Sequence, residues 1–273
     1  MTALDAVIGT SPPYADLYIS DLPAGTAQVH ITRVFHGVSV RVRGDSTTPV
    51  LGTSTHIVDW ALPVSATGEH VTYIAQAVAA SGAALGDPAV VEVATAEVDH
   101  SQAWLSDPYD PTDAVLVTLL AVDGEESAES ATSLVRTMTG MPVGIDAGRD
   151  LRATAWGVEA LDEDTVRRVD AVIGSGTSHE PGTGILLLRG DAACLDHPTG
   201  VIHLSAPRVE RERLLPHRPH VHWTFSATET RGPRGPVAVE RRTYADDLAQ
   251  HPTYADSLAA LPTYLDRLRA EVL

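Results

Sequence analysis

The sequence contains no lysine, so all 19 of its basic residues are arginine, and 36 acidic residues give a formal net charge of −17. General nucleic-acid binding needs a clustered positive surface that neutralises phosphates. The overall charge therefore argues against nucleic acid as a partner. One locally basic stretch lies between residues 208 and 242, and this asymmetry suits docking between copies of the protein or with neighbouring proteins.

Cysteine and long apolar runs are also scarce. Cys194 is the only cysteine, so no disulfide can form within the chain. The longest apolar runs, such as residues 114–122, fall far short of the ~20 residues that a membrane-spanning helix needs. The first residues lack the basic and apolar regions of a secretory signal. We therefore expect the protein to fold in a cytoplasm, without a membrane anchor.

Short stretches with alternating apolar residues dominate the first hundred residues. Turn-forming segments rich in Gly, Pro, Ser and Thr separate them. Six such stretches at this spacing predict a small β-sandwich over residues 1–99, and the protein as a whole is expected to be mainly β. The expected strands are residues 17–22, 28–34, 38–44, 55–62, 71–79 and 89–94.

A second β-rich region is expected over residues 100–230. It follows the segment 107–111, where two prolines interrupt the chain. The pattern predicts a second β-sandwich or a barrel-like domain that contains one helix. Its expected strands are residues 114–122, 133–138, 150–161, 185–190, 201–212 and 220–230.

The one helix of this region has clear start and stop signals. Asp162 suits the N-cap position, and acidic residues follow it in the first turn. Val166, Val169 and Val172 share one face, and Gly174 ends the pattern. We therefore expect an amphipathic helix with its valine face against the sheet.

The last part of the chain, residues 231–273, begins with a linker rich in Pro, Gly and Arg and continues with three Thr-Tyr-x-Asp-x-Leu units at ten-residue intervals. Each unit has a Thr and an Asp spaced as at a helix start, and Pro252 and Pro262 separate the units. Helices this short are unstable alone in water, so they must pack on another surface. That surface is either the protein's own second domain or a neighbouring subunit, and we favour an assembly arm. The predicted assembly-interface residues are Tyr244, Leu248, Tyr254, Leu258, Tyr264, Leu268, Arg241 and Arg242.

Two resemblances to known families arise from these features. The order of strands around residues 59–63 and 70–73 resembles a fibronectin type III module, in which Tyr73 would form the corner hydrogen bond. The segments 105–119 and 141–161 and the terminal repeat resemble minor tail proteins, related in layout to distal tail proteins, of long-tailed phages that infect actinobacteria. The resemblance implies a structural protein of the virion tail tip that forms a ring with copies of itself and contacts other tail proteins.

Several patterns invite a chemical interpretation. His217, His220 and His222 suggest a metal site, in which His220 and His222 would converge and His203 would supply a third ligand. They fit an outward-facing polar stripe better, and Arg218 would repel a cation. Two Arg-Gly-Asp tripeptides, at residues 43–45 and 189–191, fit tight turns better than adhesion sites. Acidic pairs such as Asp162 with Asp164 and Glu210 with Glu212 are diagnostic only by their distance in space. We predict no metal, no cofactor and no enzymatic activity.

Two other functions remain open. A carbohydrate- or host-receptor-binding module would use an exposed tryptophan as a platform for a host surface glycan, although each tryptophan lies in or beside an apolar strand. The candidates are Trp60, Trp104, Trp156 and Trp223. An enzyme acting on cell-wall polymer would need a cleft with a close pair of carboxylates.

Overall fold

The computed structural model confirms that the protein is mainly β. Apart from strands and turns, the described residues form one α-helix and one short 3-10 helix, η1 (Pro111–Asp113). All of them belong to one compact unit, Met1–Val237. No helix among them is long and apolar enough to cross a membrane. The described residues are 2–45, 50, 52–120, 127–129, 132–136, 142–146, 151–174, 185–214, 219–230 and 232.

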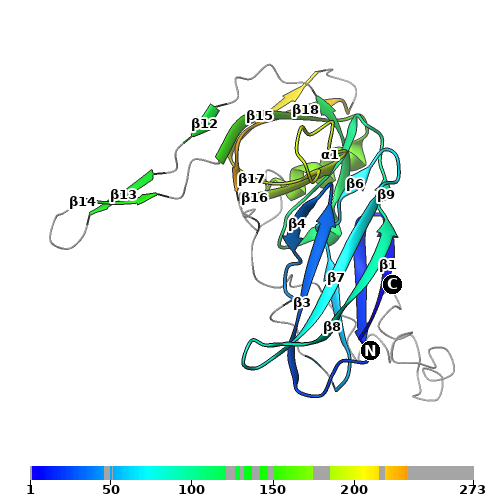
Figure 1. Ribbon diagram of the computed structural model, residues 1–273. Coiled ribbons are helices and arrows are strands. Elements are labelled where there is room, and N and C mark those ends of the chain that lie inside the picture. The colour runs from blue at the N-terminus through cyan, green and yellow to red at the C-terminus, as the bar shows by residue number, and fades with distance from the viewer. Residues whose placement is uncertain are drawn as a thin grey trace, which may run out of the picture. The chain divides into compact units, whose positions relative to one another are not determined.

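Two antiparallel sheets in the first part of the chain share one hydrophobic core, an arrangement consistent with a β-sandwich. Their strand orders are β1-β2-β5 and β4-β3-β7-β8. Figure 1 shows β3, β7 and β8 side by side. The first sheet consists of β1 (Ala3–Thr10), β2 (Pro13–Ser20) and β5 (Thr55–Asp59), and the second of β4 (Val38–Arg41), β3 (Thr26–Phe35), β7 (His70–Ala79) and β8 (Ala84–Ala94).

The alternation in the sequence explains this core. Leu17 and Ile19 on β2 and Ile31 on β3 are among its most deeply buried residues. Each of the six predicted strands corresponds to an observed one, but β1 was not predicted. It is an edge strand whose residues are exposed or only half-buried, so its sequence carries a weak apolar pattern.

A short parallel pair of strands belongs to neither of the first two sheets. β6 (Val64–Ser65) pairs with β9 (Ala96–Glu97). Val64 and Ala96 form a small apolar cluster with Val98, and Trp104 and Leu116 of the second region pack against it. This small cluster therefore brings apolar side chains of the two β-rich regions into contact.

The second region is built on a large antiparallel sheet with the order β11-β10-β16-β17-β18-β15-β12. β11 also pairs with β15, so six of these strands have a hydrogen-bonded neighbour on both sides. A separate hairpin joins β13 (Thr132–Arg136) and β14 (Pro142–Asp146). The strands of the sheet are β10 (Gln102–Ser106), β11 (Val115–Leu120), β12 (Ser127–Glu129), β15 (Leu151–Ala160), β16 (Ile185–Gly190), β17 (Val201–Arg213) and β18 (Val221–Thr230).

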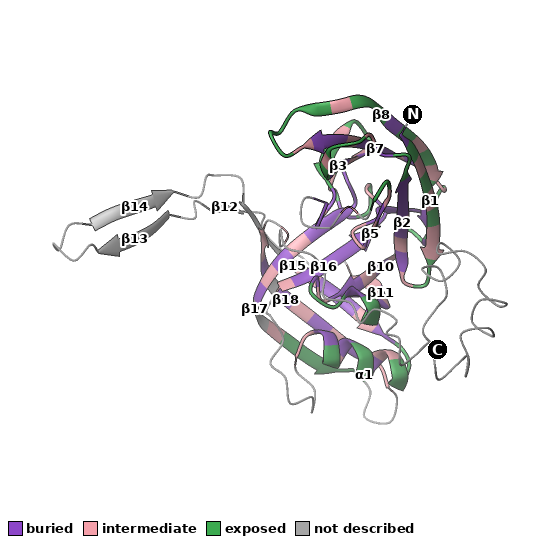
Figure 2. Ribbon diagram, turned by 90° about the horizontal axis from the view of Figure 1, so that it is seen from below, coloured by how far each residue is buried: buried purple, intermediate pink, exposed green. Residues whose placement is uncertain are grey.

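The predicted helix is confirmed as α1 (Glu163–Val172). The Asp162 carboxylate caps it by accepting a hydrogen bond from the Thr165 amide at 2.9 Å. Val166, Val169 and Val172 are buried in the core of the large sheet, and the opposite face of α1 is exposed (Figure 2). The large sheet and α1 thus enclose a second core, distinct from that of the first two sheets.

Candidate functional site

The eight predicted assembly-interface residues, from Arg241 to Leu268, lie outside the described residues. The same holds for His217 and Arg218 and for the helical repeat of the C-terminal arm. These sequence-based expectations therefore stay predictions.

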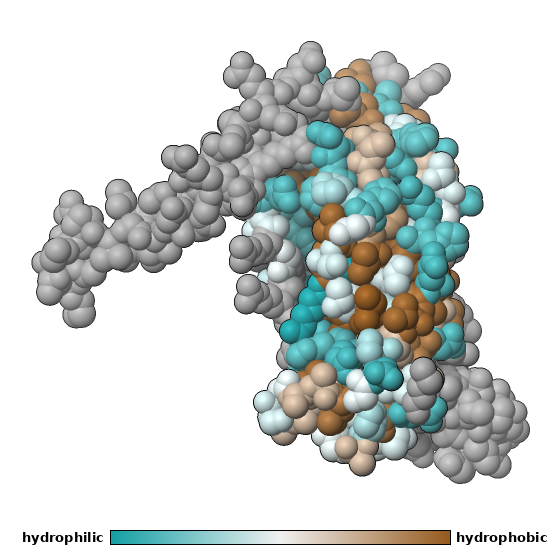
Figure 3. Space-filling view, in the orientation of Figure 1, coloured by the Kyte–Doolittle hydropathy of each residue, from teal (hydrophilic) through white to brown (hydrophobic). Residues whose placement is uncertain are grey.

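An apolar surface does occur on the first two sheets, along β1 and β8. Val90 on β8 is 59% exposed and Val7 on β1 is 41% exposed, and both are unusually open for valines. β1 and β8 lie beside each other, and Ile8 and Val93 line a shallow groove between them. Figure 3 shows hydrophobic side chains gathered on the face where β8 lies in Figure 1. Ile8 and Val93 also pack against the first core, whereas Val7 and Val90 are exposed. We call these two exposed valines and the edge strands that carry them the β1–β8 surface.

The two strands of this surface are also sheet edges. β1 pairs only with β2 and β8 only with β7 among the described strands. An edge strand presents backbone N–H and C=O groups that another chain can use. Part of β8 is protected from pairing with another chain by Asp87, Pro88 and Glu92, but Val90 and Val91 lie between them. The β1–β8 surface therefore combines exposed valines with two neighbouring strands that lie at the edges of their sheets.

The first Arg-Gly-Asp tripeptide forms a turn, as predicted. Gly44 has a φ of 81°, in the left-handed region that favours glycine. Arg43 donates a hydrogen bond to the Pro108 carbonyl oxygen. Asp45 is buried and accepts a hydrogen bond from the Ile31 amide at 3.0 Å. Both charged side chains of this tripeptide therefore make contacts within the protein.

The second tripeptide, residues 189–191, joins the two β-rich regions. Arg189 is fully buried and donates to the Pro13 carbonyl oxygen at the start of β2. Asp191 accepts a hydrogen bond from the Ala66 amide at 3.0 Å. Neither side chain is presented for recognition by another protein.

A buried ion pair lies within the first core. Arg33 Nη1 is 2.7 Å from Asp59 Oδ2, and the Tyr73 hydroxyl donates to the same oxygen at 2.9 Å. Burial alone would lower the pKa of Arg33, but Asp59 and Tyr73 together outweigh burial, so that this pKa is raised. Burial and the same carboxylate hold the pKa of Tyr73 well above its usual value. Tyr73 therefore makes a buried hydrogen bond, but its acceptor is the side chain of Asp59 and not the nearby upstream backbone of the predicted corner.

Positive charge gathers near this ion pair. Burial lowers the pKa of Arg189 to about 10, and its Nε and Nη2 have no hydrogen-bond partner within the described part of the chain. Burial, together with Arg33, Arg43 and Arg189, also lowers the pKa of His203 to about 4. His203 is thus held neutral at ordinary pH, with Gly232 against its ring.

The predicted polar stripe on β18 is confirmed. Val221 and Trp223 are fully buried, whereas His220 and His222 are half-buried on the other face. Both imidazoles point at one carboxylate, which sequence reasoning missed: Glu159 Oε2 lies 2.9 Å from His220 Nε2 and 2.6 Å from His222 Nε2. Their hydrogen bonds, led by that of His220, outweigh partial burial and lower the pKa of Glu159.

His203, the further ligand considered from sequence, lies elsewhere on the sheet. It is opposite Leu187 on β16 and Thr230 on β18, whereas His222 is opposite Glu159. The alternation of β15 places Glu159 on its polar face. Only the strand pairing, however, brings it to the histidines.

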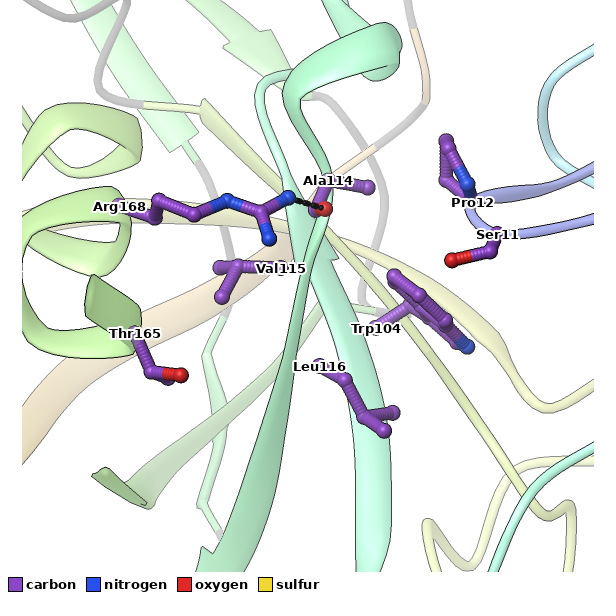
Figure 4. Close-up of a pocket in the computed structure, with 8 residues that line it drawn as sticks. All are labelled: Ser11, Pro12, Trp104, Ala114, Val115, Leu116, Thr165 and Arg168. Atoms are coloured by element: carbon purple, nitrogen blue, oxygen red, sulfur yellow. Dashed lines mark hydrogen bonds between the residues drawn. The ribbon is translucent and has the colours of Figure 1, made fainter. Parts of the chain in front are cut away.

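A small pocket of about 130 Å³ lies between the β1–β2 turn, β10, β11 and α1. Figure 4 shows Arg168 donating a hydrogen bond to the Ala114 carbonyl oxygen, at 2.6 Å, on one side of it, with Trp104 on the other. Ser11 and Thr165 supply hydroxyl groups. No carboxylate and no cysteine is among its lining residues, so it has none of the groups of a glycosidase pair.

The acidic pair on α1 has structural contacts. Asp162 caps the helix, and Asp164 forms an exposed ion pair with Arg167 at 3.1 Å. Glu210 and Glu212 lie on β17, where both are exposed. Neither pair therefore shows the arrangement of two carboxylates in a cleft that glycoside hydrolysis needs.

A scan of protein-family models finds no match to this chain, and no curated protein is significantly similar to it in sequence.

Proposed function

We propose that this protein is a structural subunit of a phage tail tip, a minor or distal tail protein that assembles with copies of itself and with neighbouring tail proteins. The observation that carries the assembly role is the β1–β8 surface, where Val7 and Val90 are exposed on two neighbouring edge strands. Such a combination is suited to a protein partner. The virion as location and a ring of copies come from the resemblance in the sequence.

The chemistry of the described residues supports a binding and assembly role. Its buried polar contacts join β-rich regions, as Arg189 and Asp191 do, and its pocket lacks an acid–base pair. The strand orders β1-β2-β5 and β4-β3-β7-β8 support the resemblance to a fibronectin type III module. In this proposal the second region is the distal-tail-like domain, and residues 231–273 form an arm received by a neighbouring copy.

Sedimentation velocity of the full chain over a range of concentrations tests the proposal. We expect concentration-dependent oligomers, and rings in negative-stain images. Val90→Asp places a charge on the β1–β8 surface and should shift the protein toward monomer. Leu161→Asp is the matched control, because Leu161 is 60% exposed and Val90 59%, yet Leu161 lies between β15 and α1.

Deletion of the residues after Arg242 tests the arm separately. We expect the shortened protein to keep its β-rich circular dichroism spectrum and to lose its oligomers. A wild-type chain that stays monomeric at every concentration would argue against self-assembly. Equal assembly of the Val90→Asp and Leu161→Asp variants would exclude the β1–β8 surface as the interface.

The alternative function is a carbohydrate- or host-receptor-binding module. Trp104 favours it, because this half-buried ring lines the pocket together with two hydroxyl groups. The pocket of about 130 Å³ is smaller than the roughly 300 Å³ at which small-molecule sites usually begin. A glycan array with the wild type and Trp104→Ala decides between the two functions, since only the module predicts binding that this variant loses.

A further inference from the structure

Three potential metal ligands meet on the outer face of β15 and β18. Their ligand atoms, Glu159 Oε2 and the Nε2 atoms of His220 and His222, all lie within 4.8 Å of one another. From this geometry we propose that the three residues bind one divalent transition-metal ion, with Zn²⁺ as the best-suited occupant. The site is independent of the assembly role proposed above.

The backbone holds these ligands in place. Glu159 and His222 are directly opposite each other in the β15–β18 pairing, so their side chains project from the same face. His220 precedes His222 by two residues and projects from that face as well. The neighbouring Val221 and Trp223 are fully buried on the other side, which prevents the strand from rotating. The three ligands are thus fixed by the same packing that forms the second core.

The spacing of the ligand atoms is close to that of a zinc site. Zinc lies about 2.1 Å from nitrogen and oxygen ligands, so tetrahedral geometry separates two ligand atoms by about 3.4 Å. In this cluster, Glu159 Oε2 lies 2.9 Å from His220 Nε2 and 2.6 Å from His222 Nε2. An outward movement of the Glu159 carboxylate of less than about 1 Å, within reach of side-chain rotation, lengthens both separations to the value of a zinc site.

The chemistry of the ligands selects the kind of ion. Two imidazoles with one carboxylate suit zinc and its neighbours in the first transition row, whereas Mg²⁺ and Ca²⁺ prefer oxygen ligands alone. Three protein ligands leave a fourth position for water or for a group from another molecule.

The surrounding charge also favours a cation. Glu212 on β17 is opposite His222 in the β17–β18 pairing and is exposed. Arg211, next to it, is paired with Asp170 of α1 at 3.1 Å. The chain as a whole carries a formal charge of −17. Arg218, which was expected to repel a cation, lies outside the described residues.

Isothermal titration with ZnCl₂ of the full chain, stripped of metal by a chelator, tests the site. We expect one saturable Zn²⁺ per chain. His220→Gln, His222→Gln and Glu159→Gln should each weaken binding at least about 100-fold, because even the loss of a residue that only supports a ligand costs 10- to 100-fold. Co²⁺ should give visible absorption bands of tetrahedral strength, and these bands should disappear in the same three variants.

His56→Gln is the matched control. His56 forms a similar partly buried pair with Asp16, at 3.1 Å, but within the described part of the chain no second histidine joins this pair, so this variant should bind zinc like the wild type. Melting curves in chelator check that each variant is folded, and zinc should raise the melting temperature of the wild type and the control only. Failure of the wild type to bind zinc, or undiminished binding by a folded His220→Gln/His222→Gln double variant, would overturn the proposal.

Discussion

Replacement of Asp59 by alanine should be among the most destabilising changes in the first core. The carboxylate accepts hydrogen bonds from Arg33 at 2.7 Å, from the Tyr73 hydroxyl at 2.9 Å and from the Ala61 amide at 3.0 Å. Arg33 and Asp59 are both almost completely buried. Removal of Asp59 leaves the Arg33 charge in the core with its hydrogen bond to the Ala61 carbonyl and without a counter-ion.

The size of the effect follows from these contacts. Breaking a buried ion pair by removing one partner typically costs about 3–5 kcal/mol. The buried Arg189 also interacts favourably with Asp59, so its charge loses a stabilising neighbour too. We therefore expect Asp59→Ala to lower the free energy of unfolding by about 4 kcal/mol, a large share of the 5–15 kcal/mol typical of folded domains.

Urea unfolding followed by circular dichroism measures this loss. Because the protein has two cores that need not unfold together, hydrogen exchange of peptides from β2, β3 and β7 should report the first core separately. Asp164→Ala is the control: its ion pair with Arg167 is more than 70% exposed on both sides, so the change should stay within about 0.5 kcal/mol. A loss below about 1 kcal/mol for Asp59→Ala would refute the reasoning.

Three further predictions concern single positions. Asp162→Ala should lower the free energy of unfolding by about 1 kcal/mol because it removes the α1 cap, whereas Asp162→Ser keeps a capping oxygen. Hydrogen bonds from Thr165 lower the pKa of Asp162. The contribution of the cap is therefore present above about pH 4 and fades as the pH falls below it. The pKa of His203 is about 4 in the folded protein, against 6.5 in the unfolded chain, so the unfolded state binds more protons between these two pH values. The free energy of unfolding should therefore fall by about 3 kcal/mol as the pH drops from 6.5 to 4. Urea titrations at several pH values should show a weaker acid dependence for His203→Gln. Gly200→Ala should destabilise the protein by at least about 2 kcal/mol in thermal or urea unfolding, because φ is +61° and the added Cβ would lie 2.4 Å from the Gly190 carbonyl oxygen. Gly25→Ala is the control: Gly25 also has a positive φ but has open space around it, so this change should destabilise the protein clearly less.

Local patterns in the sequence were enough to predict the class of fold and several of its strands and its helix. Alternating apolar residues predicted the strands of the first two sheets, and the cap at Asp162 with the valine face predicted α1. These features depend on residues within one turn or one strand of each other, so the sequence carries them directly. The edge strand β1 escaped prediction, because an element that buries little has a weak apolar pattern.

Contacts between distant residues were decided by tertiary structure alone. Glu159 reaches His220 and His222 because β15 pairs with β18 in one particular register, and a shift of one residue would turn it to the other face. In the same way, Arg189 lies fully buried beside Pro13, although the sequence shows it only near the end of a predicted strand. Alternation in the sequence determines which side chains share a face of a strand, but the pairing of strands far apart in the chain determines which of them meet.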